Sequence, residues 1–121
     1  MPKTCLNRLE VKMKVAIIGS RGITVNNIGD HLPEGCDEIV SGGAKGVDTC
    51  AEEYANANGI KLTVFLPDYA RFGKGAPLKR NEQIAEYADE AIAFWDGKSK
   101  GTEHTINMFR KRSKAVKIVE I

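Results

Sequence analysis

Short apolar segments alternate with segments of helical periodicity along the chain. The apolar run at residues 14–19 predicts a buried strand that ends in a tight Gly-Ser-Arg-Gly turn. Further strands are expected at residues 38–41, 60–66, 91–95 and 115–121. Because most of these runs are apolar on both faces, they should lie between two helix layers in a mainly parallel sheet. The pattern predicts a Rossmann-like, doubly wound α/β fold with five strands and three α/β/α layers.

The segments between these strands carry apolar residues at helical spacing. Residues 47–58 have the clearest pattern, and Gly59 follows as the expected residue just beyond the helix. Helices are also expected at 25–32, 79–88 and 101–112. A loop is expected at residues 68–77.

The composition bounds the protein class. The 121 residues fit one domain, expected at residues 14–121 after an extension or tail at 1–13. A formal net charge of +2 does not by itself predict nucleic-acid binding. No run is long enough to span a membrane, and no signal peptide is evident.

The three cysteines, Cys5, Cys36 and Cys50, are widely spaced. An odd number without a CxxC pair favours neither a disulfide framework nor a metal site. Free thiols are typical of a reducing compartment, so a cytoplasmic location is expected.

Polar and glycine-rich residues collect after four predicted strands, at the edge where open parallel sheets bind ligands. The candidate ligand-binding residues after the first three strands are Gly19, Ser20, Arg21, Ser41, Gly42, Gly43, Ala44, Gly46, Asp48 and Asp68. The later candidates are Lys74, Arg80, Asn81, Trp95, Ser99, Gly101 and Thr102. We expect these residues to share one pocket.

The segment Ser-Gly-Gly-Ala-Lys-Gly-Val-Asp at 41–48 is the expected centre of that pocket. Glycine lets the backbone approach a phosphate, backbone N–H groups can form an anion nest, and the next helix adds its positive end. The alternative is a tight strand–helix turn without a ligand. Asp48 is at least as well explained as a partner of the helix dipole.

Ser99 and Thr102 open a second helix in a similar way, where a hydroxyl can cap the helix or bind an anion. Arg21 and Arg80 are the cations expected to neutralise phosphate charge. Trp95 either packs in the core or stacks on a base. Tyr69 belongs to a loop that could close over the ligand as a lid.

Five motifs then occur in a familiar order: Gly-Ser-Arg at 19–21, the segment 41–48, Gly-Lys at 73–74, Arg-Asn at 80–81, and Phe-Trp-Asp-Gly-Lys-Ser-Lys-Gly-Thr at 94–102. Together they resemble the SLOG superfamily, specifically its small bacterial and phage members. The resemblance implies a homodimer that binds or senses a nucleotide derivative, such as ADP-ribose or an NAD-related molecule. It implies no required cofactor.

Two better-known groups imply other activities. In the lonely-guy phosphoribohydrolases, which resemble this chain in fold, an Arg and the motif PGGxGTxxE act on a nucleotide N-glycosidic bond. Arg80 and Gly101-Thr102 match parts of that pattern, but Thr105 stands where the catalytic Glu belongs. The DNA-processing protein A family shares the Gly-Ser-Arg turn, the segment 41–48 pattern and the Arg-Asn pair, which implies single-stranded DNA binding.

The resulting hypothesis is a module that binds a phosphate-bearing, nucleotide-derived small molecule. A nucleotide N-glycosidase and a single-stranded DNA-binding module are the alternatives. Catalytic residues stay unassigned, with Arg80, Glu103 and Asp96 as weak candidates, while His104 is expected to be a surface or packing histidine. Asp48 is a further carboxylate that a hydrolase would have available.

Overall fold

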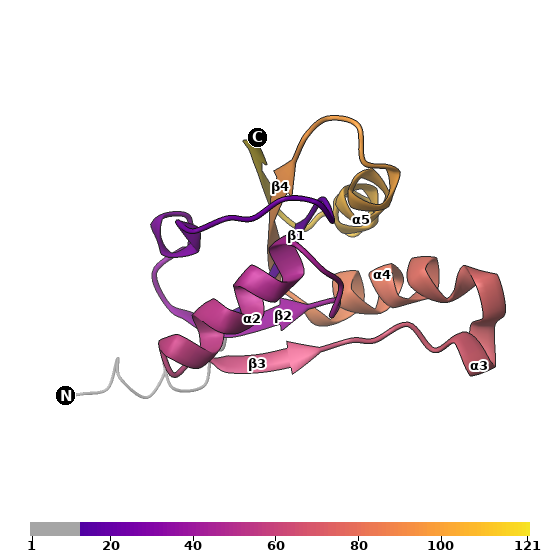
Figure 1. Ribbon diagram of the computed structural model, residues 1–121, viewed down its shortest axis with the longest axis horizontal. Helices are drawn as coiled ribbons and strands as arrows, with labels where there is room; N and C mark the ends of the chain where they lie inside the picture. The colour runs from indigo at the N-terminus through magenta and orange to yellow at the C-terminus, as the bar shows by residue number, and fades with distance from the viewer. Residues whose placement is uncertain (1–12) are drawn as a thin grey trace.

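The strands predicted from the sequence are present and pair in parallel throughout (Figure 1). The computed structural model describes residues 13–121. The strands are β1 (Met13–Gly19), β2 (Cys36–Ser41), β3 (Lys61–Val64), β4 (Glu90–Trp95) and β5 (Val116–Glu120), and the sheet order is β3-β2-β1-β4-β5. The Rossmann-like α/β fold class is therefore confirmed.

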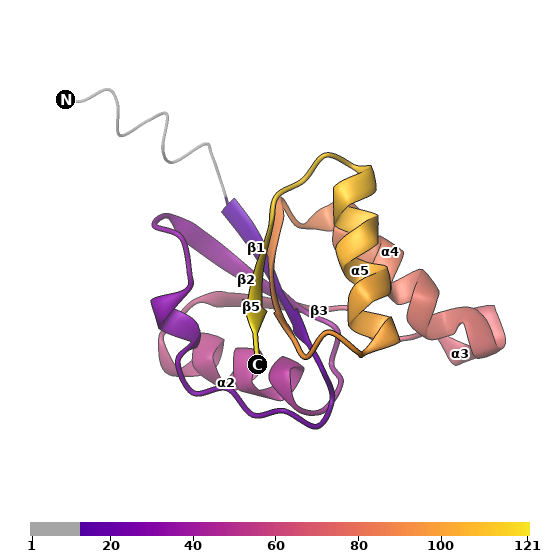
Figure 2. The same ribbon diagram turned by 90° about the horizontal axis from the view of Figure 1, so that it is seen from above.

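Helices cover both faces of this sheet (Figure 2). One face carries α2 (Val47–Ala57) and the 3-10 turn η1 (Ile28–Asp30), and the other carries α4 (Ala76–Tyr87) and α5 (Lys100–Lys111). A short helix α3 (Tyr69–Phe72) and a second 3-10 turn η2 (Gly73–Gly75) lead into α4. The expected three layers are present.

The central strand β1 joins the two halves of the core. Val15 and Ile17 pack toward α2, while Ala16 and Ile18 pack toward α4 and α5, because successive strand residues point to opposite faces. Burying an aliphatic side chain of valine or isoleucine size stabilises the fold by about 1.5–3 kcal/mol. The double-sided apolar run is thus the reason that β1 lies inside the sheet.

The prediction of a helix at residues 25–32 is wrong, since the structure has only the single turn η1 there. Asn26, Asn27 and Gly29 are poor helix formers, so little local preference supports a longer helix. Ile28 still packs into the core, and Gly29 lies so close to Tyr54 that an added Cβ would be 2.6 Å from its hydroxyl oxygen. The helical spacing of apolar residues in this segment therefore comes from a single turn whose Ile28 packs into the core, and not from a helix.

The expected loop at residues 68–77 is also corrected. It contains α3 and η2, and α4 begins at Ala76 instead of residue 79. Asp68 caps α3 by accepting a hydrogen bond from the N–H of Arg71 at 3.1 Å. Pro77 is compatible with the first turn of α4, where a backbone N–H has no intrahelical partner. Arg80 consequently lies inside the helix and not at its opening.

β2 departs from the expectation of strands that are apolar on both faces. Glu38 is buried in this strand, and its carboxylate accepts hydrogen bonds from the hydroxyls of Thr63 and Tyr87. Burial by itself raises the pKa of Glu38, but these hydrogen bonds and the Lys61 ammonium bring it below its ordinary value. β3 is also shorter than the expected run at 60–66.

The expected N-terminal extension at residues 1–13 falls almost entirely outside the described residues. Residues 1–12 of the expected extension, including Cys5, lie outside the described residues, whereas Met13 already begins β1. Among residues 13–121, no helix has the length and apolar character required to cross a membrane.

Candidate functional site

A cleft of about 390 Å³ lies at the carboxyl edge of the sheet, on the side covered by α4 and α5. Strand order reverses at β1, since β2 and β3 continue on one side of it and β4 and β5 on the other. The carboxyl ends of the strands at such a reversal form the crevice in which doubly wound proteins bind ligands. The cleft is therefore the candidate functional site.

Most of the predicted ligand-binding residues line this cleft. They are Gly19, Arg21, Gly42, Gly43, Ala44, Asp48, Arg80, Asn81, Ser99, Gly101 and Thr102. Four segments far apart in the sequence thus meet at one place: the end of β1, the turn after β2, α4, and the start of α5. Their convergence follows from parallel strands that all end at the same edge.

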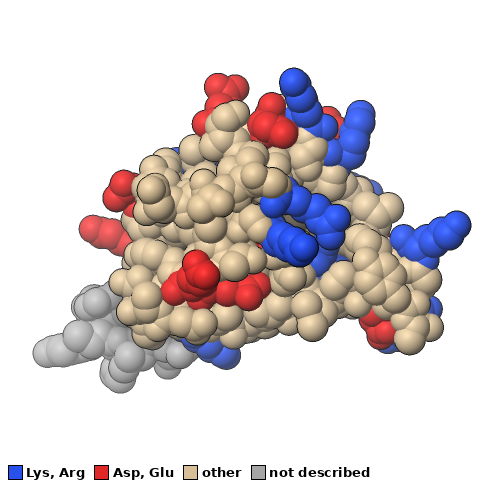
Figure 3. Space-filling model, viewed as in Figure 1, with Lys and Arg blue, Asp and Glu red and all other residues tan. Residues whose placement is uncertain are grey.

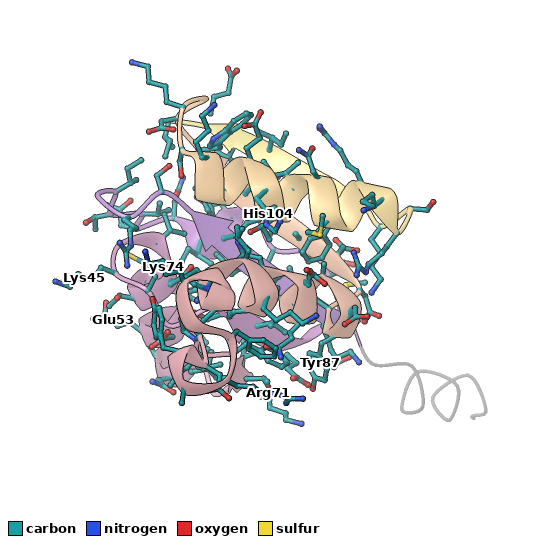
Figure 4. The ribbon with its side chains drawn as sticks, turned by 90° about the vertical axis from the view of Figure 1, so that its right-hand side faces the viewer. Lys45, Glu53, Arg71, Lys74, Tyr87 and His104 are labelled. Carbon is teal, nitrogen blue, oxygen red and sulfur yellow. The ribbon has the colours of Figure 1, made fainter. Side chains whose placement is uncertain are left out.

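The remaining predicted residues do not line the cleft. Gly46 has a φ of +79° at the start of α2, and an added Cβ would overlap the Arg21 carbonyl. Lys74 is an exposed residue of η2, labelled in Figure 4, and Asp68 caps α3. The Trp95 indole N–H donates to the Ser99 carbonyl at 3.1 Å, which braces the loop before α5. Trp95 is thus half-buried and has a structural partner.

Two predicted serines are also outside the cleft. Ser41 is buried, and its hydroxyl donates to the Glu52 carboxylate at 3.0 Å. Ser20 is buried as well, and within residues 13–121 its hydroxyl lacks a hydrogen-bond partner of good geometry. Ser41 therefore supports the turn after β2, whereas Ser20 is a buried residue between the cleft-lining Gly19 and Arg21.

Sequence reasoning missed a set of mainly apolar lining residues. They are Ile18, Pro67, Pro77, Leu78, Ile84 and Thr105, to which the structure adds Tyr69, the expected lid residue. Leu78 and Ile84 face the cleft from α4. Their role could be found only once the start of that helix, and hence its face toward the cleft, was known.

The turn after β2 is held together by its own side chains. The N–H of Ala44 donates to Oδ2 of Asp48 at 3.1 Å, and the N–H of Gly43 donates to Oγ of Ser41 at 3.2 Å. Two donors of the expected anion nest are therefore occupied inside the protein. Asp48 acts as a clamp on the turn, which goes beyond the helix-dipole role expected for it.

Arg80 reaches from α4 to this turn. Its Nη1 donates to the Gly42 carbonyl, and its Nε donates to Oδ1 of Asn81 at 2.9 Å. Gly42 lies so close that an added Cβ would be 2.8 Å from Nη1 of Arg80 and 3.0 Å from Oδ2 of Asp48. A side chain at position 42 would compete with the guanidinium for the same space.

Asp48 and Arg80 form a partly desolvated pair of opposite charge. Burial raises the pKa of Asp48 above its ordinary value, although the N–H of Ala44 and the Arg80 guanidinium act in the opposite direction. Burial likewise lowers the pKa of Arg80, and the Asp48 carboxylate partly offsets this. A guanidinium stays charged at neutral pH regardless. The cleft floor therefore carries one fixed cation beside one buried carboxylate.

The start of α5 forms the opposite wall. Ser99 caps the helix, with its Oγ accepting from the N–H of Thr102 at 3.4 Å. Asp96 accepts from the N–H groups of Lys98 and Ser99 at 2.8 and 2.9 Å, and these bonds lower the pKa of its carboxyl. Of the weak catalytic candidates, Arg80 lines the cleft, whereas Asp96 and Glu103 do not.

Basic side chains gather near the carboxyl ends of β1 and β2 in the space-filling view (Figure 3). Arg21 and Arg80 are the cleft-lining residues of this type. Among residues 13–121, no group of three or more His, Cys, Asp or Glu side chains is placed to hold a metal ion. The charged chemistry described for this cleft is therefore that of guanidinium groups and a single carboxylate.

Comparison with known proteins agrees with this architecture. Residues 13–72 match a family described as the YspA, cpYpsA-related SLOG family. The X-ray structure of DNA processing protein A (DprA) from Streptococcus pneumoniae superposes with a TM-score of 0.70 at 23% sequence identity. The match covers 93% of this chain and 52% of that one, so this chain spans about half the length of DprA. At this identity the likeness concerns the fold alone.

No curated protein matches the sequence. The predicted resemblance to the SLOG superfamily is confirmed over residues 13–72 by the family match. The matched segment contains β1, the turn after β2 and α2, while Arg80 and the start of α5 lie beyond it.

Proposed function

Starting from the SLOG-type fold of this chain, we propose that the domain binds the phosphate-bearing end of a nucleotide-derived small molecule in the cleft. The observation that carries the proposal is the placement of Arg21, Arg80 and the first turn of α5 around one cavity of about 390 Å³. Such a volume lies within the usual range for small-molecule sites.

The phosphate is proposed to sit between the two arginines and the start of α5. The first N–H groups of a helix have no intrahelical partners, and the helix dipole makes this end positive. Gly101 leaves open space, because an added Cβ would meet nothing within 4 Å. Since Gly43 and Ala44 use their N–H groups internally, α5 takes the main anion-binding role in this proposal.

The apolar side of the cleft is proposed to hold the base or ribose. Pro67, Tyr69, Pro77 and Leu78 line it, and 59% of Tyr69 and 49% of Leu78 are exposed. Large exposed apolar side chains at a cavity rim are typical of ligand sites, because a flat ring can cover them. A molecule with an anionic end and a ring would satisfy both walls.

A thermal-shift screen with AMP, ADP-ribose, NAD and inorganic phosphate tests this function. A ligand at a hundred times its Kd should stabilise the fold by about 2.7 kcal/mol. Arg80→Ala should abolish the shift for the best ligand. Lys79→Ala is the matched control, since it removes the same charge from an exposed neighbour on α4. A shift that survives in Arg80→Ala would place binding elsewhere, and no shift with any ligand would refute the proposal.

A nucleotide N-glycosidase is the second candidate, favoured by one observation. Asp48 is a cleft-lining carboxylate, 8% exposed, whose pKa burial raises, and perturbed carboxyl groups in clefts are common among catalytic acids and bases. Release of free adenine from AMP by the wild type, but not by Asp48→Asn, would establish it. Retained AMP binding without base release would reject it.

Single-stranded DNA binding remains an alternative, supported by the fold shared with DNA processing protein A and by the basic side chains near the cleft. A DNA-binding surface predicts affinity for an oligonucleotide that falls steeply as salt rises. Weak or salt-insensitive binding would reject it.

A homodimer and a cytoplasmic location complete the proposal. Light scattering tests the oligomeric state, and cell fractionation tests the location.

A further inference from the structure

We propose that His104 is a positioning residue for Arg80 and that it acts through Asn81. The three side chains form one hydrogen-bonded chain from α5 to the cleft floor. The consequence for ligand affinity rests on the proposed function, in which Arg80 contacts the ligand. The hydrogen bonding itself does not depend on a ligand and can be tested alone.

The geometry fixes the direction of each hydrogen bond. Nε of Arg80 lies 2.9 Å from Oδ1 of Asn81, and Nδ2 of Asn81 lies 3.3 Å from Nδ1 of His104. An arginine nitrogen can only donate, so the amide oxygen of Asn81 must face it. The amide NH₂ group then faces His104 and donates to it. His104 must therefore keep an unprotonated Nδ1 as acceptor.

The burial of Asn81 makes both of its hydrogen bonds costly to lose. Its residue surface is only 7% exposed, and it lines the cleft beside Arg80. A buried amide that loses a partner pays a desolvation cost, so Asn81 is held in one orientation. His104 comes from α5 on the side that faces α4 (Figure 4). It thereby links the helix at one wall of the cleft to the cation on its floor.

This link orders a side chain that would otherwise be mobile. An arginine loses substantial rotamer freedom when it is fixed in one position. Arg80 is held at Nη1 by the Gly42 carbonyl and at Nε by Asn81, which together set the plane of the guanidinium. A cation ordered before binding costs a ligand less to engage. His104 therefore tunes affinity without touching the ligand.

A role in packing alone is the competing explanation for His104, and two substitutions separate the two roles. His104→Asn places an oxygen acceptor one bond from Cγ, as Nδ1 is in histidine. His104→Leu keeps apolar volume and is the better helix former, but it has no acceptor. A positioning role predicts that His104→Asn preserves the hydrogen-bonded link and His104→Leu breaks it. A packing role predicts instead that His104→Leu is tolerated better than His104→Asn.

The first measurement is ligand-free NMR on the full chain. The Arg80 Nε–H signal is identified by its absence in Arg80→Lys, and the ring nitrogens of His104 report its tautomer. We expect an unprotonated Nδ1 of His104 in the wild type. In His104→Leu the Arg80 Nε–H should exchange with solvent about five- to tenfold faster, because that factor corresponds to the free energy of one hydrogen bond. His104→Asn should stay close to wild type. A protonated Nδ1, or unchanged exchange in His104→Leu, would overturn the proposal.

The second measurement is AMP affinity by calorimetry, with the melting temperature of each variant recorded. We expect His104→Leu to bind AMP about five- to tenfold more weakly while melting no lower than His104→Asn, which should bind like wild type. Equal losses in both variants would assign His104 to packing. If the wild type does not bind AMP, that result counts against the proposed function, and the exchange data still decide the hydrogen-bond link.

Discussion

Gly42→Ala is the substitution that most directly tests the geometry of the cleft floor. The φ of Gly42 lies outside the left-handed region, so alanine can adopt this backbone conformation. The new Cβ would lie 2.8 Å from Nη1 of Arg80 and 3.0 Å from Oδ2 of Asp48. Because Nη1 is the end of a flexible side chain, the guanidinium should move aside while the backbone stays in place.

The magnitude follows from two opposing terms. Replacing glycine by alanine at a compatible position stabilises a protein by about 0.4–1 kcal/mol through the unfolded state. Displacing Arg80 loses its hydrogen bond to the Gly42 carbonyl, and bonds that involve a charged group are worth about 1.5–3 kcal/mol. We therefore expect Gly42→Ala to lower the free energy of unfolding by about 1–2 kcal/mol, and to abolish nucleotide binding.

Urea unfolding of Gly42→Ala and Gly75→Ala provides the assay. Gly75 is the matched control, because its φ of −82° suits alanine and an added Cβ would meet nothing within 4 Å. Gly75→Ala should be neutral or slightly stabilising and should retain ligand binding. If the two variants unfold at the same urea concentration and Gly42→Ala still binds ligand, the placement of Arg80 against the turn is wrong.

Two further predictions concern stability. Gly46→Ala combines a φ of +79° with an overlap of the new Cβ on the Arg21 carbonyl, so it should lower the free energy of unfolding by about 3 kcal/mol or more. The midpoint of thermal unfolding measures this loss, and a loss below about 1 kcal/mol would contradict the close approach. Glu38 has a pKa below its ordinary value, so its contribution to stability is present above the unfolded pKa of about 4.3 and is lost as pH falls through the folded pKa. Between about pH 6 and pH 3, the wild type should therefore lose more unfolding free energy than Glu38→Gln, and equal losses would refute the assignment.

Much of the fold was predictable because its signals are local. The run at 14–19 is apolar on both faces, and this pattern alone requires cover on both sides of the strand. Gly59 marks the end of α2, with a φ of +66° that favours glycine. The errors arose where a local signal was ambiguous. Ile28 and its neighbours had helical spacing but a composition that supports only one turn.

The sequence by itself determined which segments meet at the cleft, because parallel strands bring the segments that follow them to one edge. Glycines at 42 and 43 and the arginine at 80 could be assigned to that edge before their contacts were known. Only the tertiary structure decided what each residue does there. Asp48 clamps the turn, and Asn81 connects Arg80 to His104. Those partners depend on how α4 and α5 are rotated against each other and the sheet, which is set by packing of the whole core and not by any local pattern.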